Sequence, residues 1–303
     1  MDRIRRSIAL TKASLGVLRS DKELLVFPFL SFLALVVLLA IFAVPFIGLT
    51  AGARFSDGEG VNPALVVLFF AFYLLAHIVA FFFNTALIAA AQIRLAGGDP
   101  SVRDGLAVAV KRLPAIVMYA VIAATIGYVL RSIAQRAGLL GSLVVGAIGF
   151  SWSIATFLVM PVLAAEGIGP IAAIKRSASL LRQTWGEQLV GSLGIGIVFG
   201  LIFFVGIVGG ALAIGAAAAV STTLLAVAII AVVLILGVIG LIAAAVSGIY
   251  AASVYRYATT GNAGLGFSSE TLAGTFTPIG SPPTSYNPPL PPGPPPAYGP
   301  PPG

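Results

Sequence analysis

Four polar side chains interrupt a long apolar stretch, and they are the residues best placed to do chemistry. Tyr73, His77, Asn84 and Gln92 are separated by four, seven and eight residues, so on an α-helix they share one face. Imidazole and amide groups are costly to expose to hydrocarbon, which predicts that this face points into a helical bundle. The stripe either lines a substrate path or hydrogen-bonds neighbouring helices, and the structural interpretation is favoured.

Other residue types that commonly do chemistry are scarce. The chain has no Cys and a single His, which excludes disulfides and thiol catalysis and argues against a His-based metal site. No phosphate loop, GxSxG or HExxH pattern occurs. All ten acidic residues fall outside the apolar segments or at their ends, where acids near helix starts interact favourably with the helix dipole. We therefore expect no enzyme activity, no metal ion and no cofactor.

The composition indicates that lipid is the main solvent of this chain. Of its 303 residues 59% are hydrophobic and 9% are charged, and the mean hydropathy is +1.07. In hydrocarbon each backbone polar group needs a partner within the protein, and a helix of roughly 20 residues provides this across the membrane. We predict an all-α transmembrane bundle of about six spans, at residues 24–49, 64–91, 113–130, 139–165, 189–208 and 224–254.

The last two spans are the least well delimited. No charged residue lies between Glu187 and Arg256, so residues 188–255 are long enough for three short spans. The run Ser221, Thr222 and Thr223 is the most polar break in this interval and favours two.

The distribution of basic residues predicts the orientation in the membrane. With six spans, fourteen of the 17 Lys and Arg residues lie on the same side as the N-terminus, and only Arg54, Arg131 and Arg136 lie opposite. Basic residues near span ends favour the cytoplasm. We expect a multi-pass protein of the cell (inner) membrane with both termini in the cytoplasm.

Three basic amphipathic stretches, at residues 3–22, 101–112 and 171–182, each precede a pair of spans. Their apolar residues recur at steps of three and four, which is typical of helices that lie in the membrane interface. Asp99 and Pro100 are suited to cap and begin the second helix, and Pro170 to begin the third.

The basic residues of these stretches are candidate contacts for anionic lipid headgroups, because they flank membrane spans. The same position beside spans makes nucleic acid an improbable partner. The helices either fix the topology, or together form a platform that binds lipid or a protein. The candidate residues are Arg5, Arg6, Lys111, Arg112, Lys175, Arg176 and Arg182.

The C-terminal segment differs in composition, with 13 prolines among residues 278–303. It predicts a disordered, Pro-rich cytoplasmic tail over residues 259–303. Pro295, Pro296 and Tyr298 suit the aromatic grooves of proline-binding modules, so a cytoplasmic protein is a candidate partner. The membrane domain would cover residues 1–258, in three units at 1–95, 96–166 and 167–258.

Several separated phrases carry a resemblance to a known family. They are residues 21–25 (DKELL), 83–87 (FNTAL), 97–100 (GGDP), 166–170 (EGIGP) and 184–187 (TWGE). Together they resemble a family of uncharacterised prokaryotic six-span integral membrane proteins, which implies the fold but no reaction. A looser likeness is to the membrane portions fused to some glycerophosphodiester phosphodiesterases, whose catalytic domain is absent here.

These observations favour a non-enzymatic protein that organises anionic lipid or partner proteins at the cytoplasmic face. The alternative is a small-molecule or lipid transporter that uses the polar stripe. Gly196 and Gly200, four residues apart, permit close helix packing within one chain or between copies. The sequence is therefore compatible with a homo-oligomer.

Overall fold

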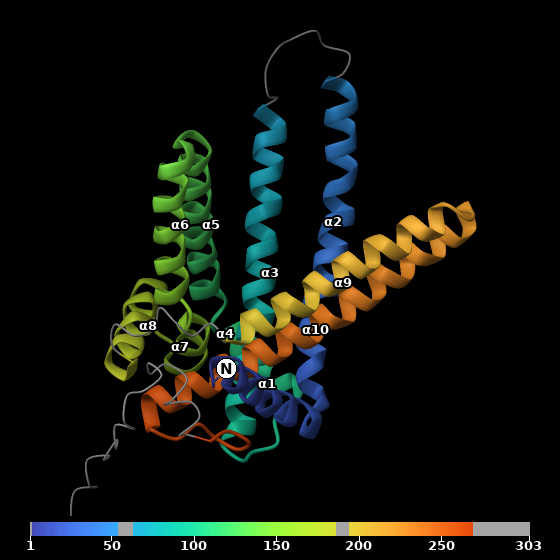
Figure 1. Cartoon of the computed structure of the whole chain (residues 1–303). Helices are drawn as coiled ribbons and strands as arrows, with labels where there is room; N and C mark the ends of the chain where they lie inside the picture. The colour runs from blue at the N-terminus through green and yellow to red at the C-terminus, as the bar shows by residue number, and fades with distance from the viewer. Residues whose placement is uncertain (1, 54–62, 186–193, 269–303) are drawn as a thin grey trace, which may run out of the picture.

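Residues 2–53, 63–185 and 194–268 are described by a computed structural model (Figure 1), and these ranges contain helices and no strand. The elements are α1 (Asp2–Ser20), the 3-10 helix η1 (Lys22–Leu25), α2 (Val26–Ala53), α3 (Pro63–Leu95), α4 (Val102–Lys111), α5 (Leu113–Arg136), α6 (Gly138–Ala155), α7 (Val159–Glu166), α8 (Pro170–Trp185), α9 (Gly194–Ala218) and α10 (Thr222–Thr260). The predicted all-α class is confirmed.

Six stretches of helix are long and apolar enough to cross a membrane, as predicted: Lys22–Thr50, Pro63–Leu95, Leu113–Arg136, Gly141–Glu166, Val198–Ala218 and Thr222–Thr260. Consecutive spans pair as α2 with α3, α5 with α6, and α9 with α10. The interval with the uncertain span count holds two long helices in its described part. They separate at Ser221, whose hydroxyl accepts a hydrogen bond from the Leu224 N–H at 3.1 Å.

Some span boundaries differ from the prediction. Helix α5 continues to Arg136 and α9 to Ala218, beyond the expected ends at residues 130 and 208, while residues 189–193 lie outside the described part. The expected span 139–165 is broken after Ala155, and α7 starts at Val159. Pro161 thereby falls in the first turn of α7, where its missing N–H is not needed. The buried Ser177 hydroxyl accepts from the Leu158 N–H at the break, at 3.0 Å.

Buried side chains concentrate where α1, α4, α7 and α8 meet the ends of the spans, which we call the basic end. In α3 the buried residues begin at Thr85, and none lies within residues 63–84. In α10 they begin at Ala245. Away from the basic end the apolar side chains are exposed, for example Val44 (75%) and Leu212 (71%). In Figure 1 the α2–α3 and α5–α6 pairs extend from the basic end in much the same direction, whereas the α9–α10 pair diverges from them; we call the outer parts of the three pairs the arms.

The outer parts of α2 and α3 have the length needed to cross the hydrocarbon core of a membrane. At 1.5 Å per residue, Asn84 lies about 31 Å from the start of α3 at Pro63. In α2, Ser31 lies about 28 Å from Thr50 by the same measure. These lengths match the hydrocarbon thickness of about 30 Å. The α2–α3 arm therefore matches the thickness of a hydrocarbon core, and the buried residues of α3 begin beyond that length.

Helix α3 is the centre of the packed core, since α2, α4, α5, α7 and α10 all contact it. Small residues allow these approaches. A Cβ added to Gly105 of α4 would lie 2.6 Å from the Ala86 carbonyl oxygen of α3 and 2.6 Å from Phe27 Cζ of α2. Only glycine at this position lets three elements meet so closely.

Candidate functional site

The amphipathic helices pack their apolar sides on the core and leave basic side chains exposed. In α8, Ala173, Leu180 and Leu181 are buried, whereas Lys175 and Arg182 are exposed. Helix α1 repeats this arrangement, with Leu10, Val17 and Leu18 buried and Lys12 and Arg19 exposed. All three helices contact or adjoin the same end of the spans (Figure 1).

Helix α4 begins later than the sequence predicted. Ser101, not Asp99, is the N-cap, and Pro100 precedes the helix. Ser101 and Asp104 form a capping box, in which the Asp104 N–H donates to the Ser101 hydroxyl at 3.3 Å and the Ser101 N–H donates to Asp104 Oδ2 at 2.9 Å. A reciprocal pair satisfies two free N–H groups, which Asp99 alone would not do. Asp99 instead lies 3.7 Å from Arg94.

Acidic side chains near η1 and α4 are also used as caps. Glu23 Oε2 accepts from the Val102 N–H at 3.1 Å, which ties η1 to the start of α4. Asp21 Oδ1 accepts from the Glu23 N–H at 3.2 Å. Burial raises the pKa of Asp21, opposed by this backbone hydrogen bond. The backbone N–H of Ser101, followed by its hydroxyl, lowers the pKa of Asp104.

Glu166 joins three helices at the basic end. Its Oε1 accepts from Arg176 Nε of α8 at 3.0 Å and from the Tyr255 hydroxyl of α10 at 3.1 Å. Next to it, Gly167 ends α7 with φ +66°, and a Cβ there would collide with the Arg112 guanidinium. The Arg112 side chain therefore lies against the Gly167 backbone, and its Nε is buried without a hydrogen-bond partner among the described residues.

The predicted lipid contacts thus separate into two groups. Lys111, Lys175 and Arg182 are exposed and form no ion pair within the described ranges, whereas Arg112 and Arg176 are engaged by the protein. Arg5 and Arg6 belong to α1, but their side chains lie outside the described part. Further exposed basic residues lie at this end within the predicted stretches 3–22 and 101–112, but the sequence prediction did not select them: Lys12, Arg19, Lys22 and Arg103.

The four residues of the polar stripe lie in three environments. The Tyr73 and His77 rings contact each other in a tilted arrangement, with centroids 4.2 Å apart and an interplanar angle of 55°, and Tyr73 lies beside Gly127 of α5. His77 Nδ1 is 2.8 Å from the Tyr73 carbonyl oxygen of its own helix. Gln92 Nε2 donates to the Pro161 carbonyl oxygen of α7 at 3.4 Å. Asn84 alone faces an open space.

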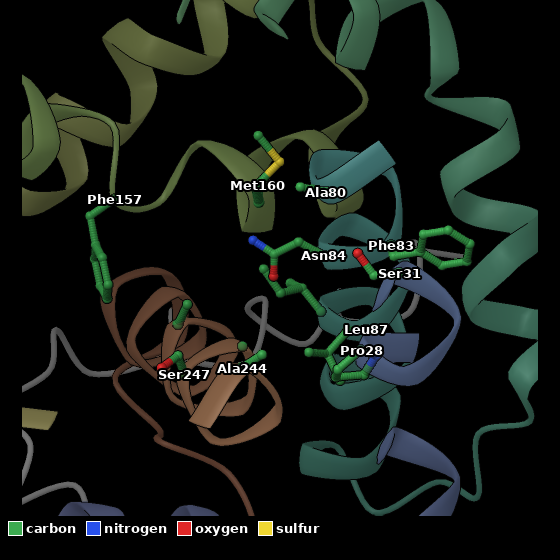
Figure 2. A pocket seen from close by; sticks show the side chains of 13 residues that line it. Pro28, Ser31, Ala80, Phe83, Asn84, Leu87, Phe157, Met160, Ala244 and Ser247 are labelled. Carbon is green, nitrogen blue, oxygen red and sulfur yellow. The ribbon is translucent and has the colours of Figure 1, made fainter. Parts of the chain in front are cut away.

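That space is a groove of about 380 Å³ between α2, α3, α7 and α10. Figure 2 shows the Asn84 carboxamide projecting into it between α3 and α10. Most of the lining is apolar, with Phe157 and Met160 on one side. The lining includes three side chains with hydrogen-bonding groups, Ser31 of α2, Asn84 of α3 and Ser247 of α10.

Two further expectations concern other parts of the chain. Pro295, Pro296 and Tyr298 of the tail lie outside the described residues. Within the described ranges, no three His, Asp or Glu side chains form a group that would hold a metal ion.

The comparisons with known proteins agree with the expected resemblance. A family model described as "Family of unknown function (DUF6159)" matches residues 63–267. The match starts with α3 and extends past α10, so α1 and α2 precede it. No curated protein and no solved structure matches the chain.

Proposed function

The chain belongs to the DUF6159 family, and because that family has no known function, we propose one from the basic end: it binds and organises anionic lipid headgroups there. In this proposal the protein is a non-catalytic component of the cell (inner) membrane. Its basic end and both termini face the cytoplasm, in keeping with the excess of basic residues on that side.

The main support for the proposal is that the acidic side chains at the basic end are hydrogen-bonded within the protein, whereas many basic side chains there are not paired within the described residues. The acidic side chains Asp21, Glu23, Asp104 and Glu166 are engaged in helix caps and a hydrogen-bonded junction. Many basic side chains at the same end are exposed and have no ion-pair partner in the described part of the chain. At the opposite end the described arms carry only Arg131 and Arg136. The result is a one-sided cationic surface.

Such a surface suits the negatively charged cytoplasmic leaflet. Each Lys or Arg near a membrane surface adds about 1 kcal/mol of attraction to anionic lipid. Because α4 and α8 pack on the ends of spans, Lys111, Lys175 and Arg182 are held on fixed helices near the headgroup region. Binding therefore requires little ordering of the protein.

No specific observation favours the transport hypothesis, since the residues of the stripe face different neighbours. The Pro-rich tail as a site for a cytoplasmic partner stays a prediction.

Native mass spectrometry of the full chain tests the proposal. The protein is extracted from nanodiscs that contain phosphatidylglycerol and phosphatidylcholine with identical acyl chains in equal amounts. We expect bound phosphatidylglycerol to predominate, and Lys111→Gln/Lys175→Gln/Arg182→Gln to weaken that preference clearly, since other exposed basic residues remain at this end. Arg131→Gln/Arg136→Gln, at the opposite end, is the matched control and keeps the preference. Equal preference in the triple variant and the wild type would refute the proposal.

A further inference from the structure

We propose that the groove between α2, α3, α7 and α10 binds the glycerol ester region and the adjoining acyl chain of one phospholipid from the leaflet at the basic end. Asn84 is the hydrogen-bond donor to an ester carbonyl in this site. The inference goes beyond headgroup binding, because it concerns the part of the molecule that all glycerophospholipids share.

The hydrogen-bonding state of Asn84 supports a ligand in this groove. The carboxamide carries two donors and an acceptor, and it makes no hydrogen bond within the described part of the chain. Ser31 and Ser247 likewise lack a partner there, although serine and threonine elsewhere in the spans bond to their own helix, as Thr125 does to the Val121 carbonyl oxygen at 2.8 Å. An amide left unpaired next to hydrocarbon is costly. A ligand with polar oxygen atoms would remove that cost.

The depth of Asn84 and Ser31 along their helices supports an ester carbonyl as the group that is bound. Asn84 and Ser31 each lie about 30 Å along their helices from the opposite end of the arms. That distance equals the hydrocarbon thickness, so both residues reach the level at which acyl chains join the glycerol esters. A lipid at this depth presents carbonyl oxygens to Asn84 and its chain to the arm side of the groove.

The volume and lining of the groove also suit one lipid chain. Its volume of about 380 Å³ is in the range of small-molecule sites, which are mostly apolar with a few placed polar groups. Gly248 of the lining leaves room for Leu87, because a Cβ there would lie 2.5 Å from Leu87 Cδ2.

Photo-crosslinking with phosphatidylcholine tests the site. One probe carries a diazirine beside the ester carbonyl and a second carries it at the methyl end of the same chain, each in nanodiscs with the full-length protein. We expect the ester-proximal probe to label residues 80–88 and 244–251 in preference to the arms. The methyl-end probe should label these segments much less, since it lies deeper in the hydrocarbon.

Two variants remove the site in different ways. Asn84→Leu removes the donor, and we expect about fivefold less labelling, the equivalent of one net hydrogen bond. Ala244→Phe fills the groove from α10 and should reduce labelling at least as much. Thr125→Val and Ala231→Phe, on surfaces outside the groove, are the matched controls and should label as the wild type does.

Even labelling along the arms that neither groove variant changes would overturn the proposal and leave only bulk lipid at this surface. Crosslinks from an Asn84 photo-amino acid to a second copy or to residues 269–303 instead of lipid would overturn it too. Because the probe is zwitterionic, failure here leaves the preference for anionic headgroups intact. Loss of that preference would equally leave this labelling unchanged.

Discussion

At the basic end, the contribution of a charged residue to holding helices together depends on its burial and its hydrogen bonds more than on whether it forms an ion pair. Glu166 is one carboxylate that serves two donors from two other helices, α8 and α10. The Arg94–Asp99 pair, by contrast, is 3.7 Å long and its Asp99 side chain is 98% exposed. An exposed pair contributes little, whereas a partly buried carboxylate that accepts two hydrogen bonds contributes more.

The first prediction compares these two acids. Glu166→Ala should lower the free energy of unfolding by about 1–2 kcal/mol, because it leaves the Tyr255 hydroxyl without an acceptor. Asp99→Ala should change it by less than about 0.5 kcal/mol. Unfolding in mixed micelles, followed by circular dichroism, measures both. Equal losses in the two variants would remove Glu166 from its role as a junction.

The second prediction concerns the end of α7. Gly167→Ala places a Cβ on a left-handed residue, which costs about 1–2 kcal/mol, and it also displaces the Arg112 side chain. Gly146→Ala in α6, where a Cβ meets nothing within 4 Å, should be neutral or slightly stabilising. The same unfolding measurement compares them. A neutral Gly167→Ala would contradict the close packing of Arg112 on this backbone.

At the level of secondary-structure elements, local hydrogen bonds determine the residue at which α4 begins. The sequence predicted a basic amphipathic helix at residues 101–112, and the structure has α4 at Val102–Lys111. The prediction of Asp99 as the cap was wrong, because Asp99 and Ser101 are both good capping residues and residue type alone does not choose between them. The reciprocal partner Asp104 selects Ser101.

The third prediction follows from the lowered pKa of Asp104. A carboxylate whose pKa is lower in the folded state stabilises above its unfolded value and loses that contribution as the pH falls through the folded one. Amide exchange in residues 101–111, corrected for intrinsic rates, should stay slow from pH 7 to 5 and accelerate below about pH 4. Asp104→Asn should lack this acid-dependent step. An identical step in the variant would assign it to another carboxyl group.

A helix or a helix boundary can be predicted from the sequence when the residues that cause it lie within the same segment. The spans, the break at Ser221 and the start of α8 at Pro170 follow from apolar length and from residues with a strong local preference. The different environments of the polar stripe residues could not be predicted in this way. Helical periodicity places Tyr73, His77 and Asn84 on one face, but it does not show which helix covers that face. Likewise, a position beside the spans put Arg112 and Arg176 among the predicted lipid contacts, whereas Arg112 packs on Gly167 and Arg176 donates a hydrogen bond to Glu166.

As a whole, the molecule is a packed core at the basic end from which three apolar helix pairs extend. The core buries the amphipathic helices together with the inner ends of α3 and α10. The arms expose large apolar side chains over most of their length. In a membrane this arrangement lets lipid enter between the arms while the core keeps their spacing.

The fourth prediction measures that arrangement. Because the chain has no Cys, single-cysteine spin labels need no background removal. Labels at Val44, Val129 and Leu212, one on each helix pair, should all be accessible to oxygen in bilayers, whereas a label at Ala252 in the core should not. Low accessibility at all three arm positions would mean that protein, such as a second copy, covers the arms.

The central claim is that the exposed basic residues of the packed end bind anionic lipid, and thermal unfolding in nanodiscs tests it most directly. A ligand that binds only the folded state raises the melting temperature with its concentration. The melting temperature of the wild type and of Arg131→Gln/Arg136→Gln should rise with the phosphatidylglycerol fraction, more at low salt than at high salt. The melting temperature of the Lys111→Gln/Lys175→Gln/Arg182→Gln variant should rise clearly less. An equal rise in that variant, or no rise in the wild type, would contradict the account.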